Sequence, residues 1–215
     1  MEQAKILNIL PTPILIQKYV GNTSVVTQFL DSLELIGDMP QAYGLHSKDT
    51  YVLDHKECFD LKKFILTNVT NFAKKVLKYD YSEYRFSQSW VTHKEPGQFH
   101  NQHAHPNSLI SGVFYYGDFD ENTPSIKFHK TLGAINASYL SPKYTLDKNQ
   151  NEITTDEYQI TCENNLLLLF PSYLYHSVPL NTTNKVRKSL SFNILPKGKI
   201  GDSNTLTELI FDRLV

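Results

Sequence analysis

Two segments near the N-terminus place apolar residues at the spacing of a helix. Over residues 24–36, apolar side chains recur every three or four positions, and Thr23 or Ser24 can cap the first turn. Over residues 60–79 the pattern is longer, with Asp60 as the cap and lysines toward the C-terminal end. The sequence therefore predicts two amphipathic helices.

After about residue 84 the pattern changes to short segments rich in aromatic and β-branched residues, separated by turn residues, as far as about Pro196. The predicted strands are 84–94, 109–117, 125–129, 134–140, 157–162, 166–170, 174–178 and 186–195. Many short strands at such spacing are typical of a sandwich or barrel. The polar interval 141–156 is expected to form an exposed loop. The spacing of Thr205 and Glu208 resembles a capping box and predicts a C-terminal helix.

No internal repeat, low-complexity tract or glycine–serine linker divides the 215 residues, and this length suits one domain. We therefore expect a single domain over 1–215, of mainly β class with flanking helices (α+β). Residues 1–83 form an N-terminal helical support region, 84–196 the β core and 203–215 the C-terminal helix.

Composition excludes several classes of protein. The chain is 40% hydrophobic and 12% aromatic, which is too apolar for a disordered tail, while no apolar run approaches the roughly 18 residues of a membrane span. Lysine plus arginine (21) almost cancels aspartate plus glutamate (22), so no overall basic field exists to bind nucleic acid. Nucleic acid is thus the least favoured partner, and no membrane partner is expected.

The cysteines and the N-terminal residues suggest the cellular compartment in which the protein resides. Cys58 and Cys162 stand far apart without a CxxC motif, so neither a disulfide framework nor a zinc ribbon is expected. The early Glu2, and the prolines at 11 and 13, do not suit a secretory signal peptide. These features favour a cytoplasmic protein.

Histidines supply the candidate chemistry. Four of the eight lie within thirteen residues, namely His93, His100, His103 and His105. Residues i and i+2 of a strand point to the same face, so His103 and His105 can direct two imidazoles at one point. His176 is a third candidate, because it begins a strand just after a turn. Three nitrogen ligands would leave open positions on an octahedral metal ion.

A simpler interpretation stands beside this one. An HxH pair also arises by chance in a polar surface segment, and His100 fits such a polar turn. The remaining histidines, His46, His55, His93 and His129, are more simply explained as solvated or hydrogen-bonded side chains.

The predicted strand 186–195 carries a polar face. Arg187, Ser189, Ser191 and Asn193 alternate with mostly apolar residues. An ordinary half-exposed strand gives the same alternation, but the apolar flanks favour a polar face that lines a cavity. Arg187 would then be a fixed cation suited to a carboxylate, with Ser189 adding a hydrogen bond. Metal ligands together with this arginine predict a site for a short dicarboxylate.

Three ordered blocks carry a family resemblance: SWVTHKEPGQFHNQHAHPNSLISGVFYY, LLLFPSYLYHSVPLN and RKSLSFN. Together, over about 89–194, they resemble the 2-oxoglutarate- and Fe(II)-dependent dioxygenase superfamily. The resemblance is to a prolyl-hydroxylase-like branch found in bacteria and phages.

The resemblance implies a double-stranded β-helix (a jelly-roll, cupin-like core) buttressed by the N-terminal helices, with Fe(II), 2-oxoglutarate and O2 as its cofactor and cosubstrates. His103 matches the first metal ligand and His176 the distal one. Arg187, eleven residues after His176, matches the residue that grips the distal carboxylate of 2-oxoglutarate, and Ser189 matches its hydroxyl companion. Tyr116 matches a tyrosine that hydrogen-bonds the same carboxylate.

His105 departs from the family pattern, because most of the superfamily has Asp or Glu there. The expected metal ligands, which are also the expected catalytic residues, are His103, His105 and His176. An all-histidine triad has one negative charge fewer, which weakens the hold on Fe(II) and changes its redox character.

Three hypotheses for function follow. The first is an oxygenase that decarboxylates 2-oxoglutarate and hydroxylates an unidentified small-molecule or peptide substrate. The second is a metal-dependent cupin-type enzyme, and the third is a non-catalytic binding or structural protein on the same fold. Arg187 with Ser189 favours the first, because a cupin has no need of a buried dicarboxylate clamp. The sequence leaves the substrate and the oligomeric state open.

Overall fold

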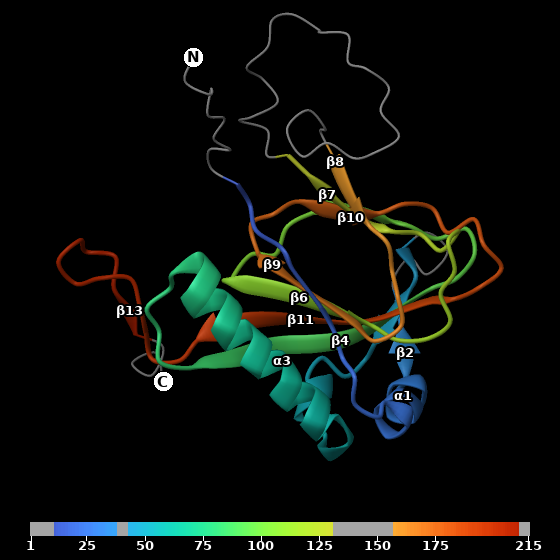
Figure 1. The fold of residues 1–215 in the computed structure, drawn as a ribbon, viewed down its shortest axis with the longest axis horizontal. Coiled ribbons are helices and arrows are strands. Elements are labelled where there is room, and N and C mark those ends of the chain that lie inside the picture. Colours follow the sequence, from blue (N-terminus) through green and yellow to red (C-terminus); the bar gives the residue numbers. More distant parts are fainter. Residues whose placement is uncertain (1–10, 38–42, 131–156, 211–215) are drawn as a thin grey trace, which may run out of the picture.

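Two antiparallel sheets form the core of the computed structural model, which describes residues 11–37, 43–130 and 157–210 (Figure 1). The larger one, the major sheet, has the order β1-β9-β6-β11-β4-β3-β2. Its strands are β1 (Leu15–Lys18), β9 (Leu166–Pro171), β6 (Ile110–Tyr115), β11 (Arg187–Pro196), β4 (Tyr84–Lys94), β3 (Leu45–Ser47) and β2 (Leu35–Ile36). The smaller one, the minor sheet, has the order β5-β10-β7-β8. Its strands are β5 (His100–His103), β10 (His176–Val178), β7 (Ile126–His129) and β8 (Glu157–Ile160).

The two sheets face each other as a jelly roll, and helices cover the outer face of the major sheet (Figure 1). Helix α1 spans Ser24–Asp31 and helix α3 spans Phe59–Asn71. Two short 3₁₀ turns, η1 (Val52–Asp54) and η2 (Lys56–Cys58), precede α3, and a π-helical segment, η3 (Phe72–Leu77), continues it. This is the mainly β, helix-flanked fold expected from the sequence.

The major sheet is buried on both faces. One hydrophobic cluster joins α1 and α3 to its outer face, through residues such as Leu30, Ile65 and Phe192. A second cluster fills the space between the sheets and includes Tyr115 and Phe170. All six residues of β6 and of β9 are buried, which explains why the LLLLFP segment is continuously apolar rather than alternating.

Gly112, in the middle of β6, marks the closest packing between the helix-side cluster and the sheet. A Cβ at this position would overlap the ring of Phe192 and lie 2.8 Å from Leu169 Cδ2. Phe192 is fully buried and has little room to move.

We therefore expect Gly112→Ala to lower the free energy of unfolding by about 1–3 kcal/mol through overpacking. Chemical denaturation of the variant measures the loss. If the Phe192 ring is the obstacle, Gly112→Ala should lower the free energy of unfolding less in the Phe192→Leu variant than in the unmodified protein. Strictly additive effects of the two substitutions would contradict this explanation.

Some predicted elements are corrected by the structure. The helix predicted over 24–36 ends earlier, because residues 35 and 36 form β2 and pair with β3. The region 1–83 is not purely helical, since β1 pairs with β9 and β3 pairs with β4 in the major sheet. Neither β1 nor β5 was predicted. The predicted strand 134–140 and loop 141–156 lie outside the described residues.

The predicted C-terminal helix is wrong over its described part. Leu209–Ile210 forms strand β13, which pairs with β12 (Lys199–Ile200). The intervening turn is closed by Asp202, whose carboxylate accepts a hydrogen bond from the Asn204 amide (2.6 Å) and whose carbonyl accepts one from the Thr207 amide (3.1 Å). These local bonds compete with helical ones. Residues 211–215 are outside the described part of the chain.

None of the described helices combines the length and the apolar character that crossing a bilayer requires.

Candidate functional site

Three histidines meet between the two sheets. His103 ends β5, His105 lies two residues further on, and His176 begins β10. Each offers one imidazole nitrogen, and these three nitrogens lie within 4.8 Å of one another. The Nε2 atoms of His105 and His176 are 3.2 Å apart. We refer to these residues as the histidine triad.

Backbone pairing brings the triad together. Strand β10 pairs with β5 so that His176 is directly opposite His103. His105 lies beyond the end of β5, and its amide donates to the carbonyl of Ser172 (3.0 Å) in the turn before β10. The expectation that one strand carries both His103 and His105 is therefore wrong, but the loop still places His105 beside the other two.

Hydrogen bonds fix the tautomers of two of the three rings. Nδ1 of His103 donates to the carbonyl of Asn101 (2.8 Å), and Nδ1 of His176 donates to the carbonyl of Leu174 (3.0 Å). With the proton on Nδ1, the Nε2 atom of each ring carries the lone pair. This is how backbone carbonyls orient metal-ligating histidines.

The triad is uncharged at neutral pH. Burial, with a smaller contribution from neighbouring histidines, lowers the pKa of His105 to about 4 and that of His176 to about 3. Burial also lowers the pKa of His103. Neutral imidazoles are the form that binds a metal ion, so the donor set fits Fe(II).

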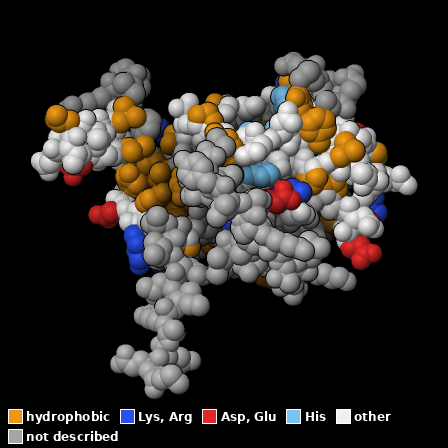
Figure 2. Space-filling model, turned by 90° about the horizontal axis from the view of Figure 1, so that it is seen from above, with side chains coloured by type: hydrophobic (Ala, Val, Ile, Leu, Met, Phe, Trp, Pro, Cys, Tyr) orange, Lys and Arg blue, Asp and Glu red, His pale blue; other side chains and the backbone are white. Residues whose placement is uncertain are grey.

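His100 is closer to the triad than the sequence suggested. Its ring stacks on that of His103, with centroids 4.3 Å apart, and it lines the same pocket. Its nitrogens are not part of the cluster that could hold one ion. His100 therefore packs against a ligand and is not one itself. Viewed from above, histidine side chains are visible at the surface, one of them beside an acidic and a basic side chain (Figure 2).

The pocket that contains the triad is walled by β4 and β11 of the major sheet. Strand β11 contributes Arg187, Ser189 and Ser191, and β4 contributes Trp90 and Lys94 among others. Apolar side chains such as Phe170 complete the lining. The polar face predicted for strand 186–195 thus points into this pocket.

Arg187 is buried in the pocket without a carboxylate partner among the described residues. It is 3% exposed. Its Nε donates to the carbonyl of Pro124 (3.0 Å), and its Nη2 donates to the hydroxyl of Tyr115 (3.1 Å). The Tyr115 ring also lies under the guanidinium, 5.0 Å from its central carbon to the ring centroid. The side chain of buried Cys162 also interacts with the guanidinium, and since a guanidinium has five N–H donors, N–H groups remain for an anion.

The predicted role of Tyr116 is wrong. Tyr116 belongs to the cluster on the helix side of the major sheet, and its hydroxyl bonds to Nε2 of His93 (3.0 Å). Its neighbour Tyr115 belongs to the cluster between the sheets, lines the pocket and contacts Arg187. Because successive residues of an extended chain point to opposite faces, a shift of one position moves the hydroxyl from one side of the sheet to the other.

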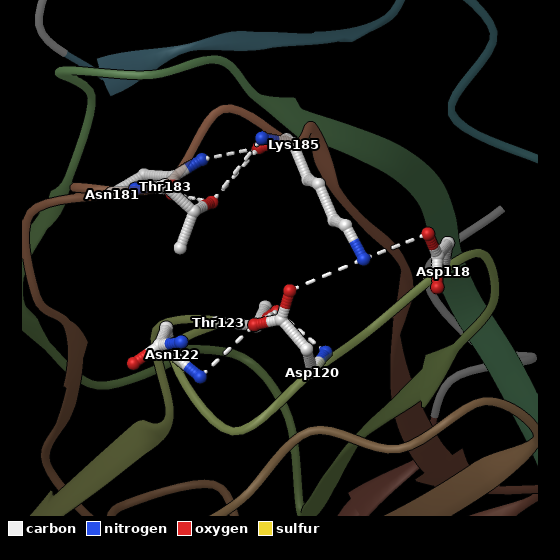
Figure 3. A network of polar contacts seen from close by, with 7 residues as sticks. All are labelled: Asp118, Asp120, Asn122, Thr123, Asn181, Thr183 and Lys185. Atoms are coloured by element: carbon white, nitrogen blue, oxygen red, sulfur yellow. Dashed lines mark hydrogen bonds and ion pairs between the residues drawn. The ribbon is translucent and has the colours of Figure 1, made fainter.

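A network of polar contacts on the surface fixes the loop between β6 and β7 (Figure 3). The carbonyl of Pro124 in this loop accepts a hydrogen bond from Arg187. Lys185 bridges the carboxylates of Asp118 (2.8 Å) and Asp120 (3.1 Å). Asp120 closes a turn by accepting from the amide of Thr123 at its carbonyl (3.1 Å). Pro124, the acceptor for Arg187, follows directly. The network therefore joins the β6–β7 loop to the segment that leads into β11.

Three imidazoles and a buried arginine that has no carboxylate partner among the described residues share one pocket of a jelly roll, an arrangement able to hold a metal ion beside a carboxylate. Residues 88–193, about half of the chain, match the family model described as "Putative 2OG-Fe(II) oxygenase". The chain belongs to the 2-oxoglutarate- and Fe(II)-dependent oxygenases, which are oxidoreductases that use Fe(II), 2-oxoglutarate and O2. No curated protein sequence matches the chain.

Solved structures agree with this fold. A prolyl-4-hydroxylase from Pseudomonas putida is 14% identical, with a TM-score of 0.55 over 87% of this chain and 94% of that one. HygX from Streptomyces hygroscopicus, solved with nickel and 2-oxoglutarate, is 12% identical, with a TM-score of 0.58 over 86% and 83%. A 2OG-Fe(II) oxygenase family oxidoreductase from Burkholderia pseudomallei is 11% identical, with a TM-score of 0.57 over 84% and 83%. At such identities the likeness establishes the jelly-roll fold.

Proposed function

We propose that this protein couples the oxidative decarboxylation of 2-oxoglutarate to the hydroxylation of a small-molecule or peptide substrate. The observation that carries the proposal is the position of Arg187, buried and without a described carboxylate partner, in the same pocket as the histidine triad. A buried guanidinium of this kind is stabilised by a ligand carboxylate.

Each group in the pocket takes a role in this proposal. His103, His105 and His176 hold Fe(II), which when bound supplies the redox chemistry that activates O2. Arg187 binds the distal carboxylate of 2-oxoglutarate through its free N–H groups. The hydroxyl of Tyr115 holds the guanidinium in place and Ser189, 3% exposed on the same wall, adds a hydroxyl donor. Apolar lining residues such as Phe170 exclude water from the reacting groups.

An anaerobic titration tests this assignment. Apo-protein is titrated with Fe(II) and then with 2-oxoglutarate, and a visible absorption band that needs both additions is expected. Admitting O2 should then release succinate. Metal binding without the band or succinate would favour a cupin-type metal enzyme. Absence of metal binding would favour a non-catalytic role for the fold.

A further inference from the structure

Lys94 is a second buried cation in the same pocket. It is the last residue of β4 and is only 1% exposed. In the pairing of β4 with β11, its Cα partner is Arg187. Directly opposite residues of an antiparallel pair have Cβ atoms about 4.5–5.5 Å apart on the same face of the sheet. Both side chains line the pocket, so two cations share it, with Lys94 bonded to the carbonyl of Tyr43 and Arg187 to the hydroxyl of Tyr115.

The ammonium group of Lys94 has few partners in the protein. Nζ donates to the carbonyl of Tyr43 (2.5 Å), its one acceptor among the described residues. Gly44 allows this approach, because its φ of 80° and its contact with the backbone of His93 leave no room for a Cβ. An ammonium has three donors, so two remain for a ligand.

The main chain at this point is held from the loop between β10 and β11. Buried Asn181 donates through Nδ2 both to the carbonyl of Lys94 (3.0 Å) and to the carbonyl of Lys185 (2.8 Å). Lys185 lies two residues before Arg187. Asn181 therefore fixes the end of β4 against the start of β11, which keeps the two cations in register.

The charge of the pocket is unbalanced. No acidic side chain is among the described residues that line it. Burial, together with the nearby charge of Arg187, lowers the pKa of Lys94 to about 8. The pKa of His103 is lowered by burial and, to a smaller extent, by the charge of Lys94. Two buried cations without an anion are costly, and a bound anion offsets that cost.

We propose that Lys94 and Arg187 bind the same carboxylate, so that two cations hold the distal carboxylate of 2-oxoglutarate. This inference rests on the proposed function, and it assigns Lys94 a direct part in choosing the cosubstrate. A carboxylate has about four acceptor positions, enough for two N–H groups of an arginine and one of an ammonium. The pocket therefore selects a 2-oxo acid with a second carboxylate over one without it.

The test compares two 2-oxo acids on the Fe(II)-loaded protein under anaerobic conditions, with dissociation constants measured by calorimetry. The probes are 2-oxoglutarate and 2-oxobutanoate, which lacks the distal carboxylate. Lys94→Met should weaken binding of 2-oxoglutarate by about 10- to 100-fold, the range for a hydrogen bond to a charged group. Binding of 2-oxobutanoate should change by less than about twofold, because it has no group for Lys94 to contact.

Lys188→Met is the matched control. Lys188 is the next residue after Arg187, but its ammonium pairs with Asp31 on the outer side of the sheet (2.7 Å). It should leave both dissociation constants unchanged. Lys94→Gln provides a second variant, because it keeps a donor for the Tyr43 carbonyl while it removes the charge. It should show the same selective loss if Lys94→Met does not fold.

The outcomes separate this inference from the proposed function. If the unmodified protein does not bind 2-oxoglutarate, the proposed function itself fails. If it does bind, and the Lys94 variants bind 2-oxoglutarate equally well, only the role of Lys94 is overturned. An equal loss for both acids would also overturn it, because Lys94 would then act on the fold or on the metal end of the pocket.

Discussion

Replacing His176 by alanine is expected to remove tight metal binding. Its Nε2 lies 3.2 Å from that of His105, and its ring is oriented by the carbonyl of Leu174. Loss of an outer partner of a metal ligand already costs 10- to 100-fold in affinity, so loss of a ligand should cost more than about 100-fold. Titration of the apo-protein with Fe(II), followed by measurement of bound metal after buffer exchange, gives the result.

Two histidines close to the triad serve as controls. His129, on β7 next to β10, bonds through Nε2 to Ser177 (2.8 Å) and is not part of the triad. His100 stacks on His103 but offers no nitrogen to the cluster. His129→Ala and His100→Ala should both retain the metal. A His176→Ala variant that holds metal as well as these controls do would show that the triad is not the metal centre.

The strands of the core could be predicted because their apolar segments are short and bounded by turn residues. The long helix was predictable for a similar reason, since its apolar face recurs over nearly its whole length. The edge strands β1 and β5 were not predicted. Strand β1 is exposed at three of its four positions, and β5 is the polar segment HNQH, so neither carries the apolar signal on which strand prediction depends. Only their pairing with β9 and β10 defines them.

Alternation along a strand predicted which residues of 186–195 line the pocket, but it did not predict which tyrosine of the β6 segment does. Arg187 and Ser189 share a face with Ser191, and the alternation along 186–195 makes this visible. In the VFYY segment both faces of the strand are buried, so polarity does not show which tyrosine points inward. In the structure it is Tyr115 that lines the pocket.

Lys94 was missed for a different reason. A lysine at the end of a predicted strand is ordinarily exposed, and nothing near it in the sequence marks it as buried. Its burial follows from long-range contacts with Arg187 and with the Tyr43 carbonyl. Pairing of the strand 84–94 with 186–195 was the missing information, since that register places Lys94 opposite Arg187.

Replacing Arg187 by methionine is expected to weaken binding of 2-oxoglutarate by at least about 30-fold, because truncating one partner of a buried, hydrogen-bonded charge pair costs 2–5 kcal/mol or more. Methionine retains much of the volume, so the variant avoids the cavity that alanine would leave. The anaerobic absorption band of the Fe(II)-loaded protein, followed against 2-oxoglutarate concentration, measures the loss. Metal content should be unchanged, since Arg187 is not among the residues that could hold the ion.

Combining this substitution with Lys94→Met tests whether both cations act on one carboxylate. If they do, both cations interact with the charge of one carboxylate. The effect of the double variant on the dissociation constant should then differ from the product of the two single effects. Independent, multiplicative losses would place the two cations on separate groups. Unchanged affinity in Arg187→Met itself would contradict the assignment of the distal carboxylate to this arginine, whereas loss of metal together with 2-oxoglutarate would mean that the substitution had disturbed the triad.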